Sequence, residues 1–314
     1  MLNIDLDELK DKLSPIIGDI DSIKPIGNHN LKRHLVYKLS CGNKNYVIKL
    51  YYKKNRWNRE VASLKIFTNS NVLTPKIIDY GIFKNGLEWM ICDFMEGQLL
   101  SRASKDIPSD NLKQIYKDMG RQLGVIHNHK EFNFYGSMDE NGKSIQEFIT
   151  YRDYFEDLIN RELPALYSFE HENLALIQEA ENKLKSMYSL LDEVEKPTLC
   201  HNDFGPRNII VGKNNGKFYL KAIIDFEQST LIDKDKELVQ VYLPLIEDNG
   251  ELAESFKLGY EEYEDIDLSK LSLKKDFYNL HRGLGICAWA KDVDYNYYLE
   301  GVRLLEETMN RFDI

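Results

Sequence analysis

The segment of residues 201–211 combines a histidine, a carboxylate and an amide in the order His-x-Asp-x-x-x-x-Asn. In this order, Asp203 can accept or orient the proton of an attacking hydroxyl group. Asn208 can turn back toward the same phosphate and hold a magnesium ion. A Gly-Pro pair supplies the turn between them, and the apolar run 209–211 predicts a buried strand that anchors the loop. The pattern predicts magnesium-assisted phosphoryl transfer, with Asp203 as the catalytic residue and Asn208 as a metal ligand.

A second carboxylate, Asp225, ends an apolar strand and is followed by Phe226 and Glu227. A carboxylate at a strand end suits magnesium, which prefers oxygen ligands. A lone aspartate at such a place is more often a turn or cap residue. Together, however, the two segments follow the order of the kinase catalytic loop and its Asp-Phe-Gly metal site, with Glu in place of Gly. We therefore expect Asp225 to bind the magnesium ion together with Asn208.

Lys49 and Glu60 form a candidate pair for positioning the phosphates of a nucleotide. Lys49 lies inside an apolar strand, and Glu60 lies on the helix expected to follow it. In a kinase arrangement the lysine binds the α- and β-phosphates, and the glutamate holds it extended. Taken alone, each has a simpler explanation, since an edge strand can point a lysine outward and an exposed helix can carry a glutamate.

Further nucleotide contacts are predicted from position. Gly27 and Asn28 precede the strand expected at 35–39, where backbone N–H groups can cradle a β-phosphate, although the segment has a single glycine. The adenine is expected to bond to backbone groups of Asp93 and Met95, between the two halves of the chain.

The elements that must position these residues fall into two parts. Residues 20–95 contain a Gly/Asn-linked hairpin, one helix and two further strands, which predict a mostly antiparallel sheet. Helices then dominate, apart from a strand-rich island at 199–226. We predict an α+β, bilobal, protein-kinase-like fold, with a nucleotide-binding N-lobe over 1–95 and a mainly helical C-lobe over 96–314 that carries the catalytic loop, metal site and substrate site. Helices are expected at 5–13, 55–68, 112–127, 145–163 and 173–194 and from 236 onward.

Composition excludes several classes of protein. The net charge of -10 argues against nucleic acid, whose phosphates attract basic surfaces. The chain has no apolar run of the ~18 to 20 residues that span a bilayer, and its N-terminal residues lack a signal-peptide pattern. Its four cysteines are widely and irregularly spaced, which predicts free thiols in a reducing compartment. We expect a cytoplasmic protein without nucleic-acid or membrane partners.

These motifs resemble those of the aminoglycoside phosphotransferase family, within the wider kinase-like phosphotransferases that include choline, homoserine, methylthioribose and macrolide kinases. The resemblance covers roughly residues 20–310 and is most specific at 201–211 and 223–227. Asn202 replaces the glycine of the family's His-Gly-Asp, and residues 232–238 loosely match Gly-Asp-Pro-x-x-Asp-Leu. The resemblance implies Mg²⁺ and ATP, or alternatively GTP, as cofactors. It also implies a catalytic aspartate, two metal ligands and a phosphate-positioning pair at Asp203, Asn208, Asp225, Lys49 and Glu60.

The sequence points to a small substrate. The short segment after Asp225 and the lack of Ala-Pro-Glu leave no platform for a protein substrate. Between Glu247 and Asp267, nine acidic residues face one lysine, an excess of 9 - 1 = 8 charges that would attract a cationic molecule. A solvated helix face is the alternative. Aromatic residues could stack on a sugar or cage a quaternary amine, or could instead form core: Tyr260, Tyr263, Trp289, Tyr295, Tyr297 and Tyr298.

The expected function is therefore an ATP-dependent kinase that transfers the γ-phosphate to an alcohol group of a small, hydroxylated, cationic molecule. An aminoglycoside-type, antibiotic-modifying enzyme is the leading interpretation. A metabolic kinase of the choline, homoserine, methylthioribose or amino-sugar type is the alternative. A non-catalytic nucleotide-binding module is a third hypothesis, because the phosphate loop has one glycine and Glu227 replaces a glycine.

Overall fold

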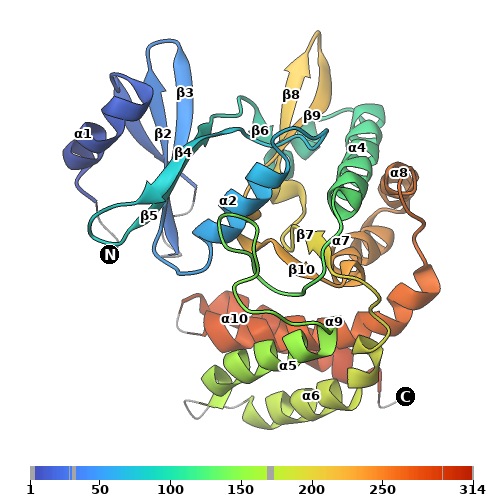
Figure 1. Cartoon of the computed structure of the whole chain (residues 1–314). Coiled ribbons are helices and arrows are strands. Elements are labelled where there is room, and N and C mark those ends of the chain that lie inside the picture. Colours follow the sequence, from blue (N-terminus) through green and yellow to red (C-terminus); the bar gives the residue numbers. More distant parts are fainter. Residues whose placement is uncertain (1–3, 28, 30–32, 168–172, 292, 313–314) are drawn as a thin grey trace.

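The computed structural model describes residues 4–27, 29, 33–167, 173–291 and 293–312. Its elements form an N-terminal lobe built on an antiparallel sheet and a larger, mainly helical C-terminal lobe (Figure 1). The predicted bilobal α+β architecture is confirmed. The boundary that we predict between residues 95 and 96 falls in the segment that joins the two lobes, and it stays a prediction.

The N-lobe sheet has the strand order β1-β2-β3-β5-β4, and all neighbours are antiparallel. Helix α1 (Leu6–Ile17) buries Leu9 and Leu13 in the core of this sheet, and Asp5 caps its first turn. Because β3 lies at the centre of the sheet, the side chains along it are enclosed. The strands are β1 (Ser22–Ile26), β2 (His34–Cys41), β3 (Lys44–Tyr51), β4 (Ile77–Ile82) and β5 (Glu88–Asp93).

Helix α2 (Trp57–Ile66) connects the sheet to the C-lobe. Its first residue donates an indole N–H to the carbonyl oxygen of Trp89 on β5, at 2.9 Å. On its other side, the hydroxyl groups of Ser63 and Ser229 lie 2.6 Å apart. The helix therefore packs against the segment that follows Asp225.

A short strand, β6 (Gln98–Leu99), carries the chain from the N-lobe into the C-lobe. It pairs with β8 (Ile209–Asn214), which pairs in turn with β9 (Lys217–Ile223). Gly97 has φ +151°, and a Cβ atom there would lie 2.4 Å from the carbonyl oxygen of Val211. Only glycine permits this close approach of the linker to the strand after Asn208.

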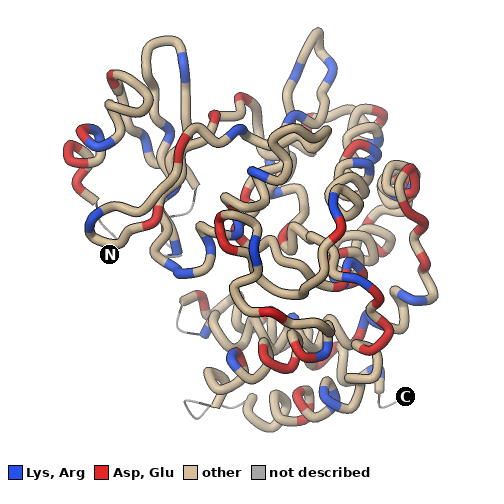
Figure 2. The backbone as a smooth tube through the Cα atoms, viewed as in Figure 1, with Lys and Arg blue, Asp and Glu red and all other residues tan. Residues whose placement is uncertain are grey.

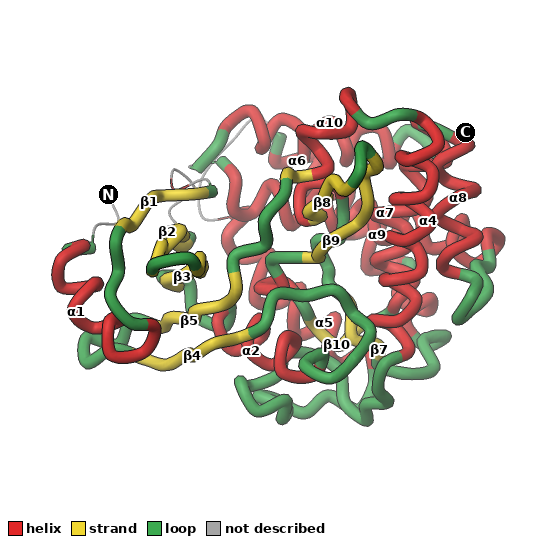
Figure 3. The backbone as a smooth tube through the Cα atoms, turned by 90° about the horizontal axis from the view of Figure 1, so that it is seen from above, coloured by secondary structure: helices red, strands yellow, loops and turns green. Residues whose placement is uncertain are grey.

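Helices make up most of the C-lobe. Two of them, α4 and α8, pack in close backbone contact, since a Cβ atom added at Gly120 would lie 1.9 Å from the carbonyl oxygen of Phe256. Figure 3 shows the N-lobe sheet and α8 at opposite ends of the molecule. The elements are α3 (Leu100–Ala103), α4 (Ser109–Asn128), α5 (Tyr151–Glu162), α6 (Leu174–Ser186), α7 (Lys234–Asp248), α8 (Gly250–Tyr260), α9 (Leu268–Ala290) and α10 (Tyr295–Met309), with β7 (Thr198–Cys200) antiparallel to β10 (Thr230–Ile232).

Three helix boundaries differ by four residues or more from the sequence-based expectation, and the first is the end of α1, at Ile17 rather than residue 13. Helix α5 begins at Tyr151 rather than at residue 145, because the preceding chain forms an isolated antiparallel bridge between Tyr135 and Phe148. Thr150 then caps α5 by accepting the N–H of Asp153. Helix α6 ends at Ser186 rather than at residue 194, and a separate 3-10 turn follows it.

Two further features concern the state of the cysteines and the length of the helices. All four cysteines are free thiols, and three of them are buried. In the described ranges, no helix combines the length and apolar composition that a membrane crossing requires.

Candidate active site

Lys49 lies buried among three carboxylates. Its Nζ atom is 2.8 Å from Glu60 Oε2, 2.7 Å from Asp225 Oδ1 and 2.9 Å from Glu227 Oε2. Burial alone would lower the pKa of this ammonium group, but the three carboxylates raise it well above its usual value. Lys49 is therefore charged and held extended from β3 toward Asp225, not pointed outward from an edge strand.

Two further side chains fix the carboxylates around Lys49. Tyr51 donates its hydroxyl to Glu60 Oε2 at 2.7 Å, and His34 Nδ1 lies 3.0 Å from Glu227 Oε2. Burial acts to raise the pKa of Glu227, but Lys49 and His34 outweigh it and hold this pKa well below its usual range. In the sequence, Glu227 is recognisable only as a replacement for glycine, and its contact with Lys49 was not predicted.

The catalytic-loop residues contact one another directly. The side-chain nitrogen Nδ2 of Asn208 donates to the backbone oxygen of Asp203 at 2.8 Å and to the Oδ2 atom of Asp203 at 3.1 Å. The guanidinium group of Arg207 donates to Oδ1 of the same aspartate. Both carboxylate oxygens of Asp203 thus have a donor. Arg207 was not predicted, and its position beside Asn208 in the sequence was the available signal.

The β8–β9 hairpin brings Asn208 and Asp225 to the same end. Ile209 pairs with Ile223, and the N–H of Ile224 donates to the carbonyl oxygen of Asn208 at 2.9 Å. Within the described residues, Oδ1 of Asn208 and Oδ2 of Asp225 have no hydrogen-bond partner. Two unused oxygen atoms of this kind fit the ligand preference of Mg²⁺.

The backbone at Asp225 is held in an uncommon conformation. Its φ and ψ angles are 68° and 59°, in the left-handed region that non-glycine residues rarely adopt. A 3-10 turn over Phe226–Gln228 follows directly and places Glu227 beside Lys49. Such strain is typical of residues whose position serves a site.

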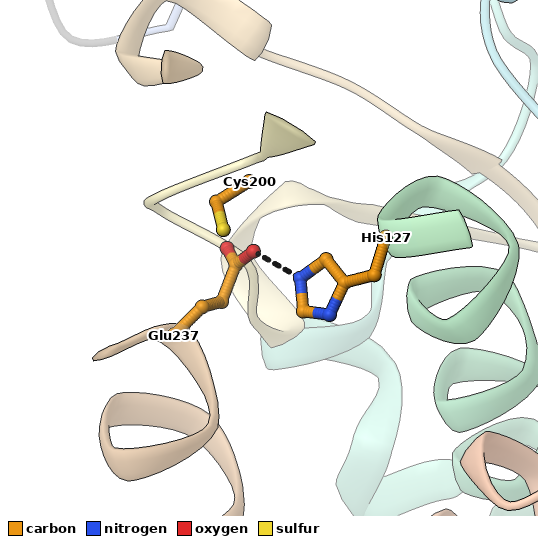
Figure 4. Close-up of side chains that lie close together, drawn as sticks. All are labelled: His127, Cys200 and Glu237. Atoms are coloured by element: carbon orange, nitrogen blue, oxygen red, sulfur yellow. Dashed lines mark hydrogen bonds and ion pairs between the residues drawn. The ribbon is translucent and has the colours of Figure 1, made fainter. Parts of the chain in front are cut away.

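A buried glutamate of α7, Glu237, supports the catalytic loop. Its Oε2 accepts the N–H of His201 at 3.0 Å, and its Oε1 accepts the N–H of Asn202 at 2.6 Å. His127 of α4 lies 3.0 Å from Oε2 through Nε2 (Figure 4). Burial opposes the charge of Glu237, but the donor from His127 and the other donors lower its pKa below the usual value.

His127, Cys200 and Glu237 offer ligand atoms within 4.8 Å of one another, as a buried metal site would (Figure 4). Their hydrogen bonds indicate another role. The Nδ1 atom of His127 is 2.9 Å from the hydroxyl of Tyr260, so both ring nitrogens are already bonded. Burial, followed by Glu237, raises the pKa of the Cys200 thiol well above its usual value, which disfavours the thiolate that a metal requires. We assign these residues to support of the loop.

Asn202 explains how this loop dispenses with the glycine of the family pattern. Its φ angle is +59°, in the left-handed region that glycine and, less readily, asparagine adopt. Its side-chain amide donates to the carbonyl oxygen of Gln228 at 3.3 Å. The substitution therefore preserves the backbone path and adds a link to the segment after Asp225.

The start of α7 is anchored by a buried lysine. Lys274 of α9 lies 2.6 Å from Asp233 Oδ2 and 2.7 Å from Asp235 Oδ2. Asp233 also caps α7 by accepting the N–H of Asp235 at 3.1 Å. The stretch 232–238, which matches the family pattern only loosely, thus fixes the helix that presents Glu237.

Three of the four residues predicted to contact the nucleotide outside the Lys49–Glu60 pair lie in the described part of the chain. Gly27 follows β1 with φ +76°, and Asn28 lies outside the described residues. Asp93 donates its own N–H to the carbonyl oxygen of Lys76 at 3.0 Å, so only its carbonyl group is available to a base. Met95 has no backbone hydrogen bond to another described residue. Both positions keep the groups that an adenine contact needs.

Comparison with known proteins decides the family. Residues 23–269 match the profile of APH, a phosphotransferase enzyme family. The chain belongs to the APH phosphotransferase family. One curated relative, the "Protein LicA homolog" of Mycoplasma capricolum subsp. capricolum, is 38% identical over 90 residues. That match covers 29% of this chain and 34% of the relative, so the chain spans about a third of the relative's length.

Solved structures confirm the kinase-like fold of this APH-family chain. Aminoglycoside phosphotransferase APH(4)-Ia has a TM-score of 0.75 at 14% identity, with 98% of this chain and 99% of that chain covered. Spectinomycin phosphotransferase APH(9)-Ia, in complex with ADP and spectinomycin, has a TM-score of 0.63 at 18% identity, with 98% and 95% covered. APH(2")-IIIa, in complex with GDP and kanamycin, has a TM-score of 0.63 at 17% identity, with 97% and 99% covered.

The acidic stretch expected at the substrate site lies elsewhere in this APH-family chain. It runs along α8 and its flanks, and α8 packs on α4 at the end of the molecule opposite the N-lobe sheet (Figures 1 and 3). Several of its carboxylates form ion pairs with neighbouring helices, including Glu251 with Lys113 at 2.7 Å and Glu262 with Arg121 at 2.6 Å. Much of the stretch is therefore a helix surface paired with neighbouring cations, which is the alternative to a substrate-attracting rim.

The aromatic candidates divide into core and surface. Tyr260 and Tyr298 are buried, and Tyr260 bonds to His127. Trp289 is 37% exposed, and the guanidinium carbon of Arg33 lies 5.5 Å from its ring centroid. Trp289 therefore faces the loop that precedes β2, whereas Tyr260 belongs to the support of the catalytic loop.

Proposed function

We propose that this protein transfers the γ-phosphate of ATP to a hydroxyl group of a small molecule, with Mg²⁺ as the metal ion. The observation that carries the proposal is the arrangement around Lys49 and Asp203. Lys49 Nζ lies 2.7 Å from Asp225 Oδ1. The residue before Asp225 donates its backbone N–H to the carbonyl oxygen of Asn208. The side chain of Asn208 donates to Asp203 Oδ2 at 3.1 Å. A phosphate-binding cation, two metal-binding oxygens and a base thus lie in one connected network.

The residues divide the work of phosphoryl transfer. Lys49, held by Glu60, would bind the α- and β-phosphates. Asn208 and Asp225 would hold the magnesium ion, which supplies positive charge to the phosphate oxygens. The backbone around Gly27 would cradle the phosphates, and Asp93 and Met95 would contact the base.

Asp203 would orient the acceptor hydroxyl and take its proton. Arg207 donates to Oδ1 of this carboxylate and so helps to orient it. Asn208 donates to Oδ2 at 3.1 Å and so fixes the carboxylate plane. Because Glu237 binds the backbone directly before Asp203, the loop is already formed without substrate.

The acceptor is best sought first among small metabolites. The acidic stretch was one reason to expect an aminoglycoside as substrate. Several of its carboxylates form ion pairs with cations of α4 and α9 instead. A metabolic kinase of the choline, homoserine, methylthioribose or amino-sugar type is therefore favoured over an antibiotic-modifying enzyme. The APH-family neighbours that bind spectinomycin and kanamycin keep aminoglycosides in the panel.

A coupled ADP-release assay tests the proposal. It is run with Mg·ATP and Mg·GTP over choline, homoserine, methylthioribose, amino sugars, macrolides and aminoglycosides. Asp203→Ala should lower turnover by ~10² to 10⁴ while Mg·ATP still binds. Asp225→Ala should abolish magnesium-dependent nucleotide binding in calorimetry, since it removes a metal ligand. Unchanged turnover in the first variant, or unchanged Mg·ATP affinity in the second, contradicts the assigned role.

A non-catalytic nucleotide-binding module is the competing class. Its two grounds in the sequence are the single-glycine phosphate loop and Glu227, and Glu227 contributes a third carboxylate to Lys49 at 2.9 Å. Slow hydrolysis of ATP without an acceptor, lost in Asp203→Ala, would argue for the enzyme. Nucleotide binding without hydrolysis or transfer in any condition would favour the module.

A further inference from the structure

Cationic side chains gather beside the proposed transfer site without matching anions. They come from the loop before β2, the loop before α2, the first turn of α2 and the first turn of α7. Figure 2 shows Lys and Arg segments at the lower end of the N-lobe, where the chain enters α2. We call the following residues the basic cluster: Arg33, Lys53, Arg56, Arg59 and Lys236.

The cluster adjoins the segment that follows the proposed metal ligand Asp225. Arg56 donates to the side-chain oxygen of Gln228. The carbonyl oxygen of Arg59 accepts the hydroxyl of Ser229 at 3.3 Å. Two members of the cluster are therefore fixed to the turn immediately after Asp225.

On the C-lobe side, the basic cluster adjoins Glu237, the buried glutamate that holds the catalytic loop. Lys236 precedes Glu237, which binds the backbone of the two residues before Asp203. Near it, His281 of α9 packs 4.8 Å from the ring of Phe155. The cluster thus lies between the turn after Asp225 and the helices that carry the loop.

No member of the basic cluster forms an ion pair with another described residue. Within the described residues, the side chains of Arg59 and Lys236 make no hydrogen bond or ion pair, although Lys236 is only 7% exposed. The Nε atoms of Arg33 and Arg59 and both ring nitrogens of His281 are buried without a hydrogen bond. Buried cations are normally paired, because an uncompensated buried charge is strongly destabilising.

The protonation of these groups reflects the same imbalance. Burial and then Arg59 lower the pKa of Arg56 to about 10. Burial also lowers the pKa of Lys236, and burial followed by Lys236 lowers that of His281. Like charges crowd one another here, and a bound anion would relieve the repulsion.

Glu227 and Glu162 act to raise the pKa of cluster members such as Arg59, but within the described residues no carboxylate forms an ion pair with the cluster. Glu227 is engaged by Lys49 and His34. The side chain of Glu162 is 41% exposed, and its closest basic neighbour among the described residues is His281, whose Nε2 lies at 3.6 Å. The cluster therefore keeps cationic groups that an anion from outside the chain could pair with.

We infer that the basic cluster binds an anionic group, a carboxylate or a phosphate, carried by the acceptor molecule. This inference rests on the proposed function and names its substrate class as acidic, hydroxylated metabolites. On one side, Lys236 precedes Glu237, which binds the loop before Asp203. On the other side, Arg56 bonds to Gln228, in the turn after Asp225. Lys49 is assigned to the nucleotide phosphates and is not part of the cluster. An acceptor held by its anionic group at the cluster would have its hydroxyl directed toward Asp203.

Inorganic phosphate and malonate are suitable probes, because the acceptor is not identified. The whole protein is saturated with Mg·AMP-PNP and titrated with each anion by calorimetry. Both anions should bind, and Lys236→Gln and Arg59→Gln should each weaken binding by ~10-fold or more, the scale of one lost charge-assisted contact. Lys234→Gln is the matched control: it lies on the same turn of α7 but is paired with Glu264 at 2.9 Å, so anion affinity should not change.

Thermal unfolding provides a second measurement. Phosphate should raise the Tm of the native protein and not that of Lys236→Gln. Without phosphate, Lys236→Gln should not lower the Tm, since no partner is lost. A lowered Tm together with an unchanged phosphate affinity would make Lys236 a structural cation and overturn the inference. Anion binding that disappears when AMP-PNP is present would assign the cluster to the nucleotide instead, and it would also overturn the inference.

The outcome separates this inference from the proposed function. If phosphate binds as expected but no acceptor is phosphorylated, the proposed kinase activity fails and the anion site remains. If a neutral or cationic acceptor is turned over and neither anion binds, the kinase activity stands and the anion site fails. For an acidic acceptor found in the screen, Lys236→Gln should raise the KM for the acceptor and leave the KM for ATP unchanged.

Discussion

Glu237→Gln tests whether one buried carboxylate holds the catalytic loop in place. In the native protein, Oε1 accepts the N–H of Asn202 at 2.6 Å, and Oε2 accepts the N–H of His201 at 3.0 Å and lies 3.0 Å from His127 Nε2. Glutamine has the same size but replaces one acceptor oxygen by an NH₂ donor. Whichever way the amide turns, one backbone N–H of the loop loses its acceptor.

The expected cost follows from these contacts. A buried N–H without an acceptor costs about 1–3 kcal/mol, and the remaining bonds lose the added strength of a charged acceptor. We expect the free energy of unfolding to fall by about 2–4 kcal/mol. A shift of about 1 Å in the loop would lower kcat by ~10²-fold. Affinity for Mg·ADP should change little, because Lys49 and Asp225 are untouched.

The effect on stability should depend on pH. The pKa of Glu237 in the folded protein lies below its usual value of 4.5. Its charge therefore stabilises the fold fully above pH 4.5, and this stabilisation is lost as the pH falls through the lower folded-state pKa. The difference in unfolding free energy between native protein and variant should shrink at acid pH. Urea denaturation from pH 7 to pH 3.5 measures it.

A surface glutamate provides the control. Glu251 pairs with Lys113 at 2.7 Å on the exposed face of α8, and Glu251→Gln should leave the free energy of unfolding close to native, because exposed ion pairs contribute little. If Glu237→Gln behaves like this control, with native kcat and native stability, then Glu237 does not hold the loop and the role assigned to it is wrong.

Two further substitutions test backbone geometry. Asn202→Gly should leave stability and turnover near native, whereas Asn202→Ala should cost about 1–2 kcal/mol because alanine tolerates φ +59° poorly; equal stability of both variants in urea would contradict this. Gly259→Ala should destabilise the protein by about 1–3 kcal/mol, since its Cβ would lie 1.8 Å from the carbonyl oxygen of Lys117. Its nucleotide affinity should stay native, and a change in that affinity without a loss of stability would show that the α4–α8 contact is not what the glycine serves.

Local patterns in the sequence were sufficient for the central chemistry. The spacing of Asp203 and Asn208 and the strand before Asp225 depend on a loop and a hairpin that neighbouring residues specify. Lys49 and Glu60 could be paired because a strand followed by a helix brings them together over a short span of chain. The predicted pair is found at 2.8 Å.

Contacts between distant segments could not be read in this way. His127 and Glu237 meet only because α4 and α7 pack around β7, and no local pattern in either helix indicates that contact. The acidic stretch shows the same limit for charge, because composition does not say which neighbour a helix surface will meet. Its carboxylates pair with cations such as Lys113 and Arg121.

The fit of Gly97 against Val211 bears on how the two lobes can move. Since β6 is bonded to β8, the chain from Gly97 onward travels with the strand that begins after Asn208. Because the N–H of Phe94 donates to Asn45 of the N-lobe at 3.2 Å, a rocking N-lobe would pivot in the short stretch between Phe94 and Gly97. Opening and closing would shift Lys49 relative to Asp203 while leaving the distance from Asn208 to Asp203 constant.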